Sequence, residues 1–225
     1  MTPCPLHPRA RRRARPLRAA VLLAALLLVG VAGAASAQEP LIINEILADP
    51  ASDWDGDGLV DFKGDEWIEV RNVGPDMIDL STYWLRDDTG TEPHLQLFGE
   101  LAPEGIAVFY GSDAVAWQAA NGYSTTGFSL NNGGDVVRLL RSIPGSEELE
   151  LMYVAHYEDH MAEDDRSCGW QADMFDWVLF DGLWPYTGSL EPGSTGCVPT
   201  PGLPNVCGSV AVEARSFGAV KSLFR

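Results

Sequence analysis

The chain of 225 residues has few basic residues, few histidines and few long apolar runs. It contains 15 Lys and Arg, against 32 Asp and Glu, and four His. Six of the Arg lie within residues 1–37, which hold no acidic residue, so residues 38–225 keep nine basic and 32 acidic residues, a formal net charge of −23. Such a surface repels nucleic-acid phosphates and anionic lipid headgroups, so we expect no nucleic acid as a partner.

The one long apolar run lies near the N-terminus. Residues 19–35 read AAVLLAALLLVGVAGAA, behind the six Arg and ahead of Ala35-Ser36-Ala37. A basic region, an apolar run and a small-residue cleavage site are typical of a secretory signal peptide, here residues 1–37. An uncleaved anchor is the alternative, although residues 19–29 fall short of the roughly 20 that a span needs. We predict a secreted or extracellular bacterial protein, or one at the cell surface, with no transmembrane span in its mature chain.

The sequence lacks the compact motifs of common enzyme classes. It has no GxSxG, HExxH, Walker loop, GxGxxG or CxxC. The segment HYEDHMAEDD (156–165) places His156 and His160 four residues apart, which on one helix face could bind a transition metal. No third ligand is identifiable, and an exposed acidic loop is the simpler interpretation. We therefore expect no enzyme, and we keep a metal-dependent hydrolase that uses this cluster as the alternative.

Three cysteines follow the signal segment, Cys168, Cys197 and Cys207. An exported chain meets an oxidising compartment, which favours one disulfide and leaves one thiol. The sequence allows three pairings. We favour a disulfide from Cys168 to Cys197 or to Cys207, because it would close the longer loop.

Glycine and proline interrupt residues 41–205 at short intervals, which favours strands over helices. Seven segments are short, rich in β-branched or aromatic residues and bounded by turn residues: 41–47, 66–72, 83–87, 94–98, 105–110, 135–140 and 148–154. They predict an all-β sandwich, with 112–123 as the one short helix and Gly122 just past its end. We expect Trp67 and Trp84 to fill the sandwich core. The domain would span 38–206, followed by a tail.

Six short motifs follow one another between residues 43 and 205. They are INEI with DP (43–46 and 49–50), DEWIEVRN (65–72), IDLSTYWLRDDTG (78–90), LAPEGIAVFYG (101–111), LNNGGDVVRLL (130–140) and PTPGLPN (199–205). In this order they resemble the lamin tail domain family, an immunoglobulin-like β-sandwich, and in particular its secreted bacterial type. Tyr83 and Glu104 depart from the family's usual residues. The resemblance implies a non-catalytic module used for binding, adhesion or tethering.

The stretch DWDGDGLVDFKGDEW (53–67) is the most acidic part of the chain. Asp at alternate positions ahead of Gly58 lets several carboxylates converge on Ca²⁺ while the chain turns sharply. The predicted ligands are Asp53, Asp55, Asp57, the carbonyl of Leu59, Asp61 and Asp65. Gly64 stands where helical calcium loops carry a bidentate acid. We predict a structural Ca²⁺ site with a Kd of about 10⁻⁴ to 10⁻³ M, and the alternative is a solvated acidic hairpin loop.

Residues 207–225 form a short basic and aromatic tail. Phe217, Val220 and Phe224 recur at the spacing of one helix face, and three of the nine basic residues of the mature chain are Arg215, Lys221 and Arg225. The pattern indicates a sorting or docking segment, or else a frayed terminus.

The leading functional hypothesis is a secreted or cell-surface binding or adhesion module that Ca²⁺ stabilises at residues 53–61. Its partner would be a protein or a ligand of the cell envelope. Besides the hydrolase, a purely structural envelope component is a further alternative.

Overall fold

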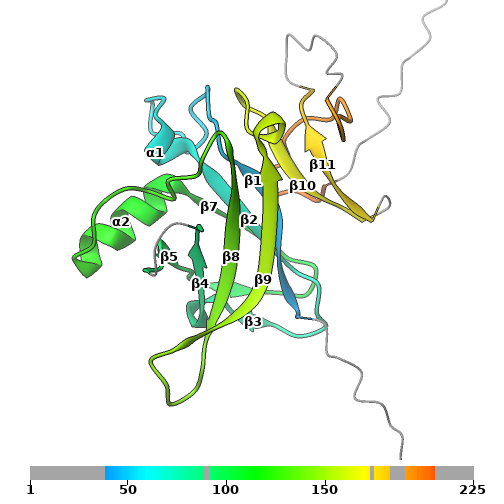
Figure 1. Ribbon diagram of the computed structural model, residues 1–225. Helices are drawn as coiled ribbons and strands as arrows, with labels where there is room; N and C mark the ends of the chain where they lie inside the picture. Colours follow the sequence, from blue (N-terminus) through cyan, green and yellow to red (C-terminus); the bar gives the residue numbers. More distant parts are fainter. Residues whose placement is uncertain (1–38, 89–91, 173–174, 183–190, 206–225) are drawn as a thin grey trace, which may run out of the picture. The chain divides into compact units, whose positions relative to one another are not determined.

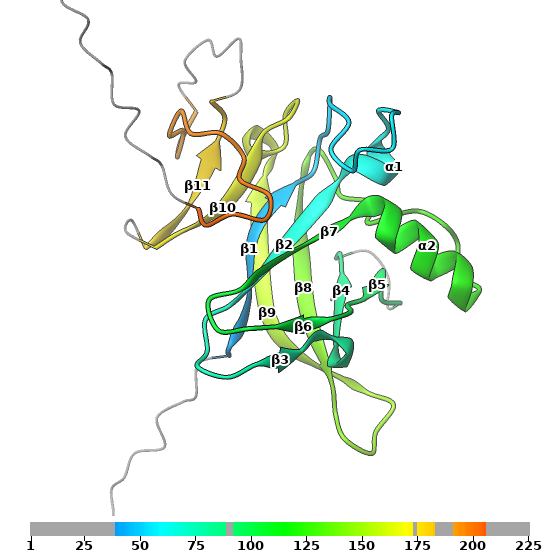
Figure 2. The ribbon, with the colours of Figure 1, turned by 180° about the vertical axis from the view of Figure 1, so that it is seen from behind.

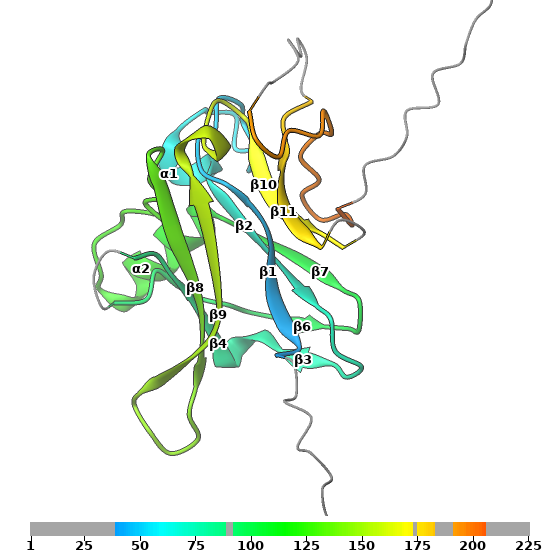
Figure 3. The same ribbon diagram turned by 45° about the vertical axis from the view of Figure 1, so that its right-hand side comes forward.

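Two antiparallel β-sheets pack face to face in the computed structural model, which describes residues 39–88, 92–172, 175–182 and 191–205 (Figure 1). The predicted signal peptide, Cys207 and the predicted tail lie outside the described residues. Figure 3 shows β8 and β9 of one sheet facing β1, β2 and β10 of the other. The all-β, immunoglobulin-like sandwich predicted from the sequence is confirmed.

The larger sheet has the strand order β11-β10-β1-β2-β7. Its strands are β1 (Leu41–Leu47), β2 (Trp67–Asn72), β7 (Ile106–Tyr110), β10 (Ser167–Gln171) and β11 (Asp176–Phe180). The smaller sheet has the order β5-β4-β8-β9, from β4 (Tyr83–Arg86), β5 (Leu95–Gln96), β8 (Gly134–Ser142) and β9 (Leu149–Glu158). A separate short ladder joins β3 (Ile78–Asp79) to β6 (Glu100–Leu101).

Within the ranges that the structure describes, two helices and two 3₁₀ turns complete the fold. The helices are α1 (Phe62–Asp65) and α2 (Gly111–Asn121), and the 3₁₀ turns are Leu80–Thr82 and Asp159–Met161. Gly122 follows α2 with φ +77°, the left-handed conformation that ends a helix, as the sequence predicts.

The core lies between the two sheets, because alternate residues of each strand point into it. The larger sheet contributes buried Leu41, Ile43, Ile46, Ile68, Val70 and Phe109, and the smaller sheet contributes Tyr83, Leu85, Val137, Leu139, Ala155 and Tyr157. Burying one such aliphatic or aromatic side chain contributes about 1.5–3 kcal/mol, so this cluster dominates the stability of the sandwich.

A β-bulge at Asn44 changes which side chains of β1 face the core. The register with β2 pairs Ile43 with Val70 and then Glu45 with Glu69, which leaves Asn44 as the extra residue. Ile43 and Ile46 both belong to the core, so the two residues between them, Asn44 and Glu45, are free to face the opposite side.

The sequence predicts seven of the strands correctly but misses β10 and β11, and also the two-residue strands β3 and β6. The signal for β10 is hidden by Gly169 at its centre, since glycine normally weakens a strand. A Cβ atom at Gly169 would lie 2.6 Å from Asn205 Nδ2 and 2.7 Å from the carbonyl oxygen of Asn44. The glycine is therefore needed because residue 205 crosses directly over the strand.

Two predictions about individual side chains are corrected. Cys168 is buried with a free thiol, so a disulfide from Cys168 is wrong. Cys197 is disulfide-bonded. Cys207, which the third of the allowed pairings joins to it, lies outside the described residues. Trp67 is fully buried, whereas Trp84 is only half-buried and points away from the core, because its neighbours Tyr83 and Leu85 occupy the inner face.

Candidate functional site

The acidic loop connects β1 to α1 at one end of the sandwich (Figure 1). It brings Asp53, Asp55 and Asp57 together, with one carboxylate oxygen of each within 4.8 Å of the other two. Asp53 and Asp57 are exposed and Asp55 is half-buried. These three are the predicted ligands that the structure groups as a candidate cation site.

Backbone N–H groups inside the loop fix these carboxylates. Asp53 accepts hydrogen bonds from the N–H of Gly56 at 2.8 Å and of Gly58 at 3.0 Å. Asp55 accepts one from Asp57 at 3.0 Å, and Asp57 accepts one from Leu59 at 2.7 Å. Gly56 and Gly58 have φ of +78° and +91°, a conformation that favours glycine and turns the chain around the carboxylates.

Asp61 and Asp65 are bound to the backbone beside this group. Asp61 accepts hydrogen bonds from the N–H groups of Lys63 and Gly64, which makes it the N-terminal cap of α1. Asp65 is buried and accepts the N–H groups of Trp54, Asp55 and Asp61 at 2.6–3.1 Å. Its carboxylate therefore links the two ends of the acidic loop, Trp54 and Asp55 on one side and Asp61 on the other.

Gly64, at the twelfth position of the loop, has no side chain. Carboxylates of other loop residues lie around it. A Cβ at Gly64 would lie 3.2 Å from Asp55 Oδ2 and 3.5 Å from Asp61 Oδ1. The oxygens of Asp55 and Asp61 thus converge where a ligand side chain would stand in a helical calcium loop. Leu59, the predicted carbonyl ligand, is 65% exposed to solvent as a residue.

A tryptophan attaches the loop to the folded sheet. The ring of Trp54 meets that of Trp67 edge to face, with centroids 6.0 Å apart, and its Nε1 donates to Asp165 Oδ1 at 2.7 Å. Asp165 also accepts the backbone N–H groups of Ala51 and Ser52 at 2.8 and 3.0 Å. The two acidic stretches of the sequence are therefore in direct contact.

The predicted cluster at residues 156–165 is not a helix face. His156 is exposed on β9, while His160 lies in the 3₁₀ turn that follows. His160 Nδ1 is 3.6 Å from Glu158 Oε2, and its Nε2 is 3.2 Å from the carbonyl oxygen of Pro192. Over the described ranges, the grouping of potential metal ligands is Asp53, Asp55 and Asp57, with neither histidine included.

Two buried carboxylates hold the segment 199–205 on the outer face of the larger sheet (Figure 2). Glu45 accepts the Thr200 N–H at 3.1 Å, the Thr200 hydroxyl at 2.7 Å and the Ser167 hydroxyl at 2.5 Å. Glu69 accepts the Gly202 N–H at 2.7 Å. We call these contacts, with those of Asn44 and Asn205 described next, the polar latch.

The side chains of Asn44 and Asn205 complete the polar latch. Asn44 Nδ2 donates to Glu69 Oε1 at 2.5 Å and to Asn205 Oδ1 at 3.0 Å. Asn205 Nδ2 in turn donates to the carbonyl oxygens of Asn44 at 2.9 Å and Trp170 at 3.2 Å. The polar latch thus ties β1, β2 and β10 to the end of the described chain.

Burial raises the pKa of both latch carboxyls. Glu45 and Glu69 face each other across β1 and β2 and expose no surface. Loss of water raises the pKa of Glu45, against the hydrogen bonds from Ser167 and Thr200. Burial, opposed by the Asn44 hydrogen bond and reinforced by the charge of Glu45, raises the pKa of Glu69 from 4.5 to about 8. Two ionised carboxylates side by side are unfavourable in a dry site.

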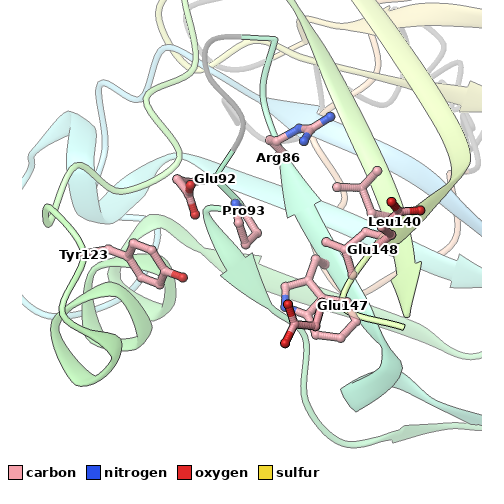
Figure 4. A pocket seen from close by; sticks show the side chains of 9 residues that line it. Arg86, Glu92, Pro93, Tyr123, Leu140, Glu147 and Glu148 are labelled. Carbon is pink, nitrogen blue, oxygen red and sulfur yellow. The ribbon is translucent and has the colours of Figure 1, made fainter. Parts of the chain in front are cut away.

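A groove of about 590 Å³ lies on the outer side of the smaller sheet (Figure 4). Its apolar walls come from Trp84, Pro93, Tyr123, Leu140 and Leu149, and its charged groups are Arg86, Glu92, Glu147 and Glu148. Figure 4 shows Tyr123, beyond the end of α2, on one side and the two glutamates of the β8–β9 hairpin on the other. We call this feature the outer groove.

The comparison with protein families decides what this sandwich is. The Lamin Tail Domain model matches residues 34–155, more than half of the chain. The chain belongs to the lamin tail domain family. No curated protein matches the chain.

The matched range ends at Ala155, inside β9. Strands β10 and β11 and the segment 199–205 therefore lie beyond the lamin tail domain match, although β10 pairs with β1 in the same sheet. The motifs INEI and DEWIEV supply the polar latch through Asn44, Glu45 and Glu69. Polar residues of these two family motifs therefore hold in place a segment that lies beyond the family match.

Sequence reasoning missed both the polar latch and the outer groove. Carboxylates and an amide within strands of apolar residues were a signal for the latch, since buried polar groups need partners. The outer groove had no such signal, because its walls come from five separate stretches of sequence. Among the described residues, no helix is long and apolar enough to cross a membrane.

The raised pKa of Glu69 predicts that stability falls with rising pH. Between about pH 5 and 8 the folded chain keeps a proton on Glu69 that the unfolded chain releases, so the free energy of unfolding should drop as pH rises. One such proton gives a slope of about 1.4 kcal/mol per pH unit at most. Urea unfolding at pH 5, 6, 7 and 8 measures this slope. Glu69→Gln should reduce it by the share of one proton, and Glu66, whose pKa burial also raises to about 8, should keep a slope in the variant.

The control is Glu100→Gln, at an exposed position of β6 outside the polar latch. It should keep the wild-type slope. An unchanged slope in Glu69→Gln would show that Glu69 ionises alike in the folded and unfolded chain, against this account.

Proposed function

We propose that the chain is a secreted or cell-surface, non-catalytic binding or adhesion module, and that Ca²⁺ stabilises its loop at residues 53–61. The observation that carries the calcium part is the convergence of Asp53, Asp55 and Asp57 within 4.8 Å. Oxygens at opposite sides of a Ca²⁺ ion, each 2.3–2.6 Å away, lie about 5 Å apart. Three carboxylate oxygens at this spacing fit around one cation.

The donor set suits a hard cation. Every candidate ligand is an oxygen, and oxygen is the ligand that Ca²⁺ prefers, with six to eight of them in flexible geometry. Within the described part of the chain, Asp55 Oδ2 accepts no hydrogen bond, while Asp55 Oδ1 accepts the N–H of Asp57. Asp61 lies next to Asp55 around Gly64 and would supply a fourth carboxylate.

A bound cation would act on structure and not on a reaction. Neutralising the three carboxylates removes their mutual repulsion, which opposes the turn at Gly56 and Gly58. The ordered loop then carries Trp54 onto Trp67 at the start of β2. Ca²⁺ would stabilise this end of the sandwich, and a weak site suits the millimolar Ca²⁺ of extracellular fluids.

The contacts of the buried and half-buried acidic side chains support a binding role over a catalytic one. Those of the polar latch, and also Asp65 and Asp165, are engaged by backbone or side-chain donors of the fold. The two histidines of the alternative hydrolase lie on different elements, with His160 held against Pro192. The lamin tail domain family consists of immunoglobulin-like modules, which suits binding better than hydrolysis.

Calcium should raise the melting temperature of the mature chain, residues 38–225. With a Kd of about 10⁻⁴ to 10⁻³ M, 10 mM Ca²⁺ stabilises the folded state by about 1.4–2.7 kcal/mol. For a domain of this size the melting temperature should rise by about 3–10 °C. Thermal unfolding followed by circular dichroism, with CaCl₂ and with EDTA, measures the shift.

The matched variants are Asp55→Asn in the loop and Asp76→Asn on an exposed turn. Asp55→Asn should lose the calcium shift and Asp76→Asn should keep it. Equal shifts in both variants would assign the effect to the overall negative charge and would refute a site at this loop.

The adhesion role predicts saturable binding to cell envelopes. Fluorescently labelled mature chain should sediment with envelopes from the organism that encodes it, and excess unlabelled chain should compete. An unrelated secreted protein of similar net charge is the control. The double variant His156→Ala, His160→Ala should bind as the wild type does. Envelope retention no greater than that of the control protein would refute the adhesion role.

A further inference from the structure

We propose that the outer groove binds an extended polypeptide segment that carries lysine or arginine. The inference rests on the proposed binding function and names the chemical class of its partner. Three features of the groove support it: an aromatic side chain on each of two walls, an excess of carboxylates, and apolar surface between them.

The aromatic side chains are Trp84 and Tyr123. Trp84 is half-buried on β4 and turned away from the core. Tyr123 stacks on Trp117 of α2, with ring centroids 5.3 Å apart and an interplanar angle of 13°, and its N–H donates to the carbonyl oxygen of Gln118. The Tyr123 ring is therefore held in place before a ligand arrives. A cationic side chain near the face of Trp or Tyr is attracted by the ring quadrupole.

The charge of the lining is complementary to a basic partner. Arg86 supplies one positive charge against the three carboxylates of Glu92, Glu147 and Glu148, which leaves a net charge of −2. None of these three glutamates forms an ion pair with a described residue. The other cationic side chains of the described ranges are engaged elsewhere: Arg71, Arg138, Arg141 and Arg166 with acids, and Lys63 with a carbonyl oxygen.

The apolar surface suits the stems of such side chains. Lys and Arg lay their methylene groups along apolar surface and keep the charged end near polar groups. Leu140, Leu149 and Pro93 offer that surface between the aromatic rings and the glutamates. A volume of about 590 Å³ is in the range of specific ligand sites and accommodates a few residues. A neutral sugar would use the rings but gain nothing from the carboxylates, and nucleic acid would be repelled.

The test uses the mature chain and two synthetic peptides. One fluorescein-labelled decapeptide alternates Lys with Ala, and the other has Gln in place of each Lys. Fluorescence anisotropy at 150 mM NaCl should show saturable binding of the lysine peptide and none of the glutamine peptide. Glu147→Gln with Glu148→Gln should weaken binding about five- to tenfold, and Trp84→Leu should weaken it about fivefold.

The matched control removes the same charge from another face. Asp76→Asn with Glu100→Gln, both exposed and outside the outer groove, should leave the Kd within about twofold of the wild type. Equal weakening by both double variants would show a general attraction to an acidic surface and would overturn the proposal. Wild-type binding by Trp84→Leu and by Glu147→Gln with Glu148→Gln, with unaltered melting temperatures, would also overturn it, as would binding of neutral oligosaccharides in place of the lysine peptide.

Failure of this inference and failure of the proposed function give different results. If the wild type binds envelopes but not the lysine peptide, the groove assignment is wrong and the adhesion role stands. If it binds the peptide through the outer groove but not envelopes, the groove assignment stands and the adhesion role fails.

Discussion

The hydrogen bonds that Glu45 and Glu69 accept within the larger sheet are the constraint on which the rest of the structure depends. Two carboxyl groups opposite each other on neighbouring strands repel when both are ionised, and these two are also fully buried. The arrangement persists because hydroxyl, amide and backbone donors meet the carboxylate oxygens. Most of those donors come from residues 200–205, so the C-terminal segment and the sheet stabilise each other.

The polar latch also explains features that look unrelated in the sequence. The bulge at Asn44 places an amide and a carboxylate side by side on the outer face of β1. Because Gly169 has no side chain, Asn205 can cross β10 at that position. Each feature alone weakens a strand, and together they make room for the crossing segment.

The acidic residues of the chain fall into two classes with different consequences. Glu45, Glu69, Asp65 and Asp165 hold the fold through hydrogen bonds to the backbone or to other side chains. The carboxylates of the acidic loop and of the outer groove are at the surface and remain available to cations. The carboxyl groups inside the domain therefore serve structure through hydrogen bonds, and those at the surface are the ones that the proposed calcium and peptide sites would use.

The fold could be predicted from the sequence further than the candidate sites could. Alternation of apolar and polar residues placed seven strands, because that pattern depends on neighbours within each strand. The grouping of Asp53, Asp55 and Asp57 was also predictable, since all three lie within five residues. Contacts between distant stretches were not: Asp165 with Trp54, and Thr200 with Glu45, join residues more than 100 positions apart.

The most direct test of this account is the coupling between Asn44 and Asn205. A double-mutant cycle would compare urea unfolding of Asn44→Ala, Asn205→Ala and the double variant with that of the wild type. Because the two side chains are hydrogen-bonded and buried, the account predicts a coupling free energy of about 0.5–3 kcal/mol. Additive effects, with a coupling near zero, would contradict the claim that the polar latch holds the C-terminal segment on the sheet.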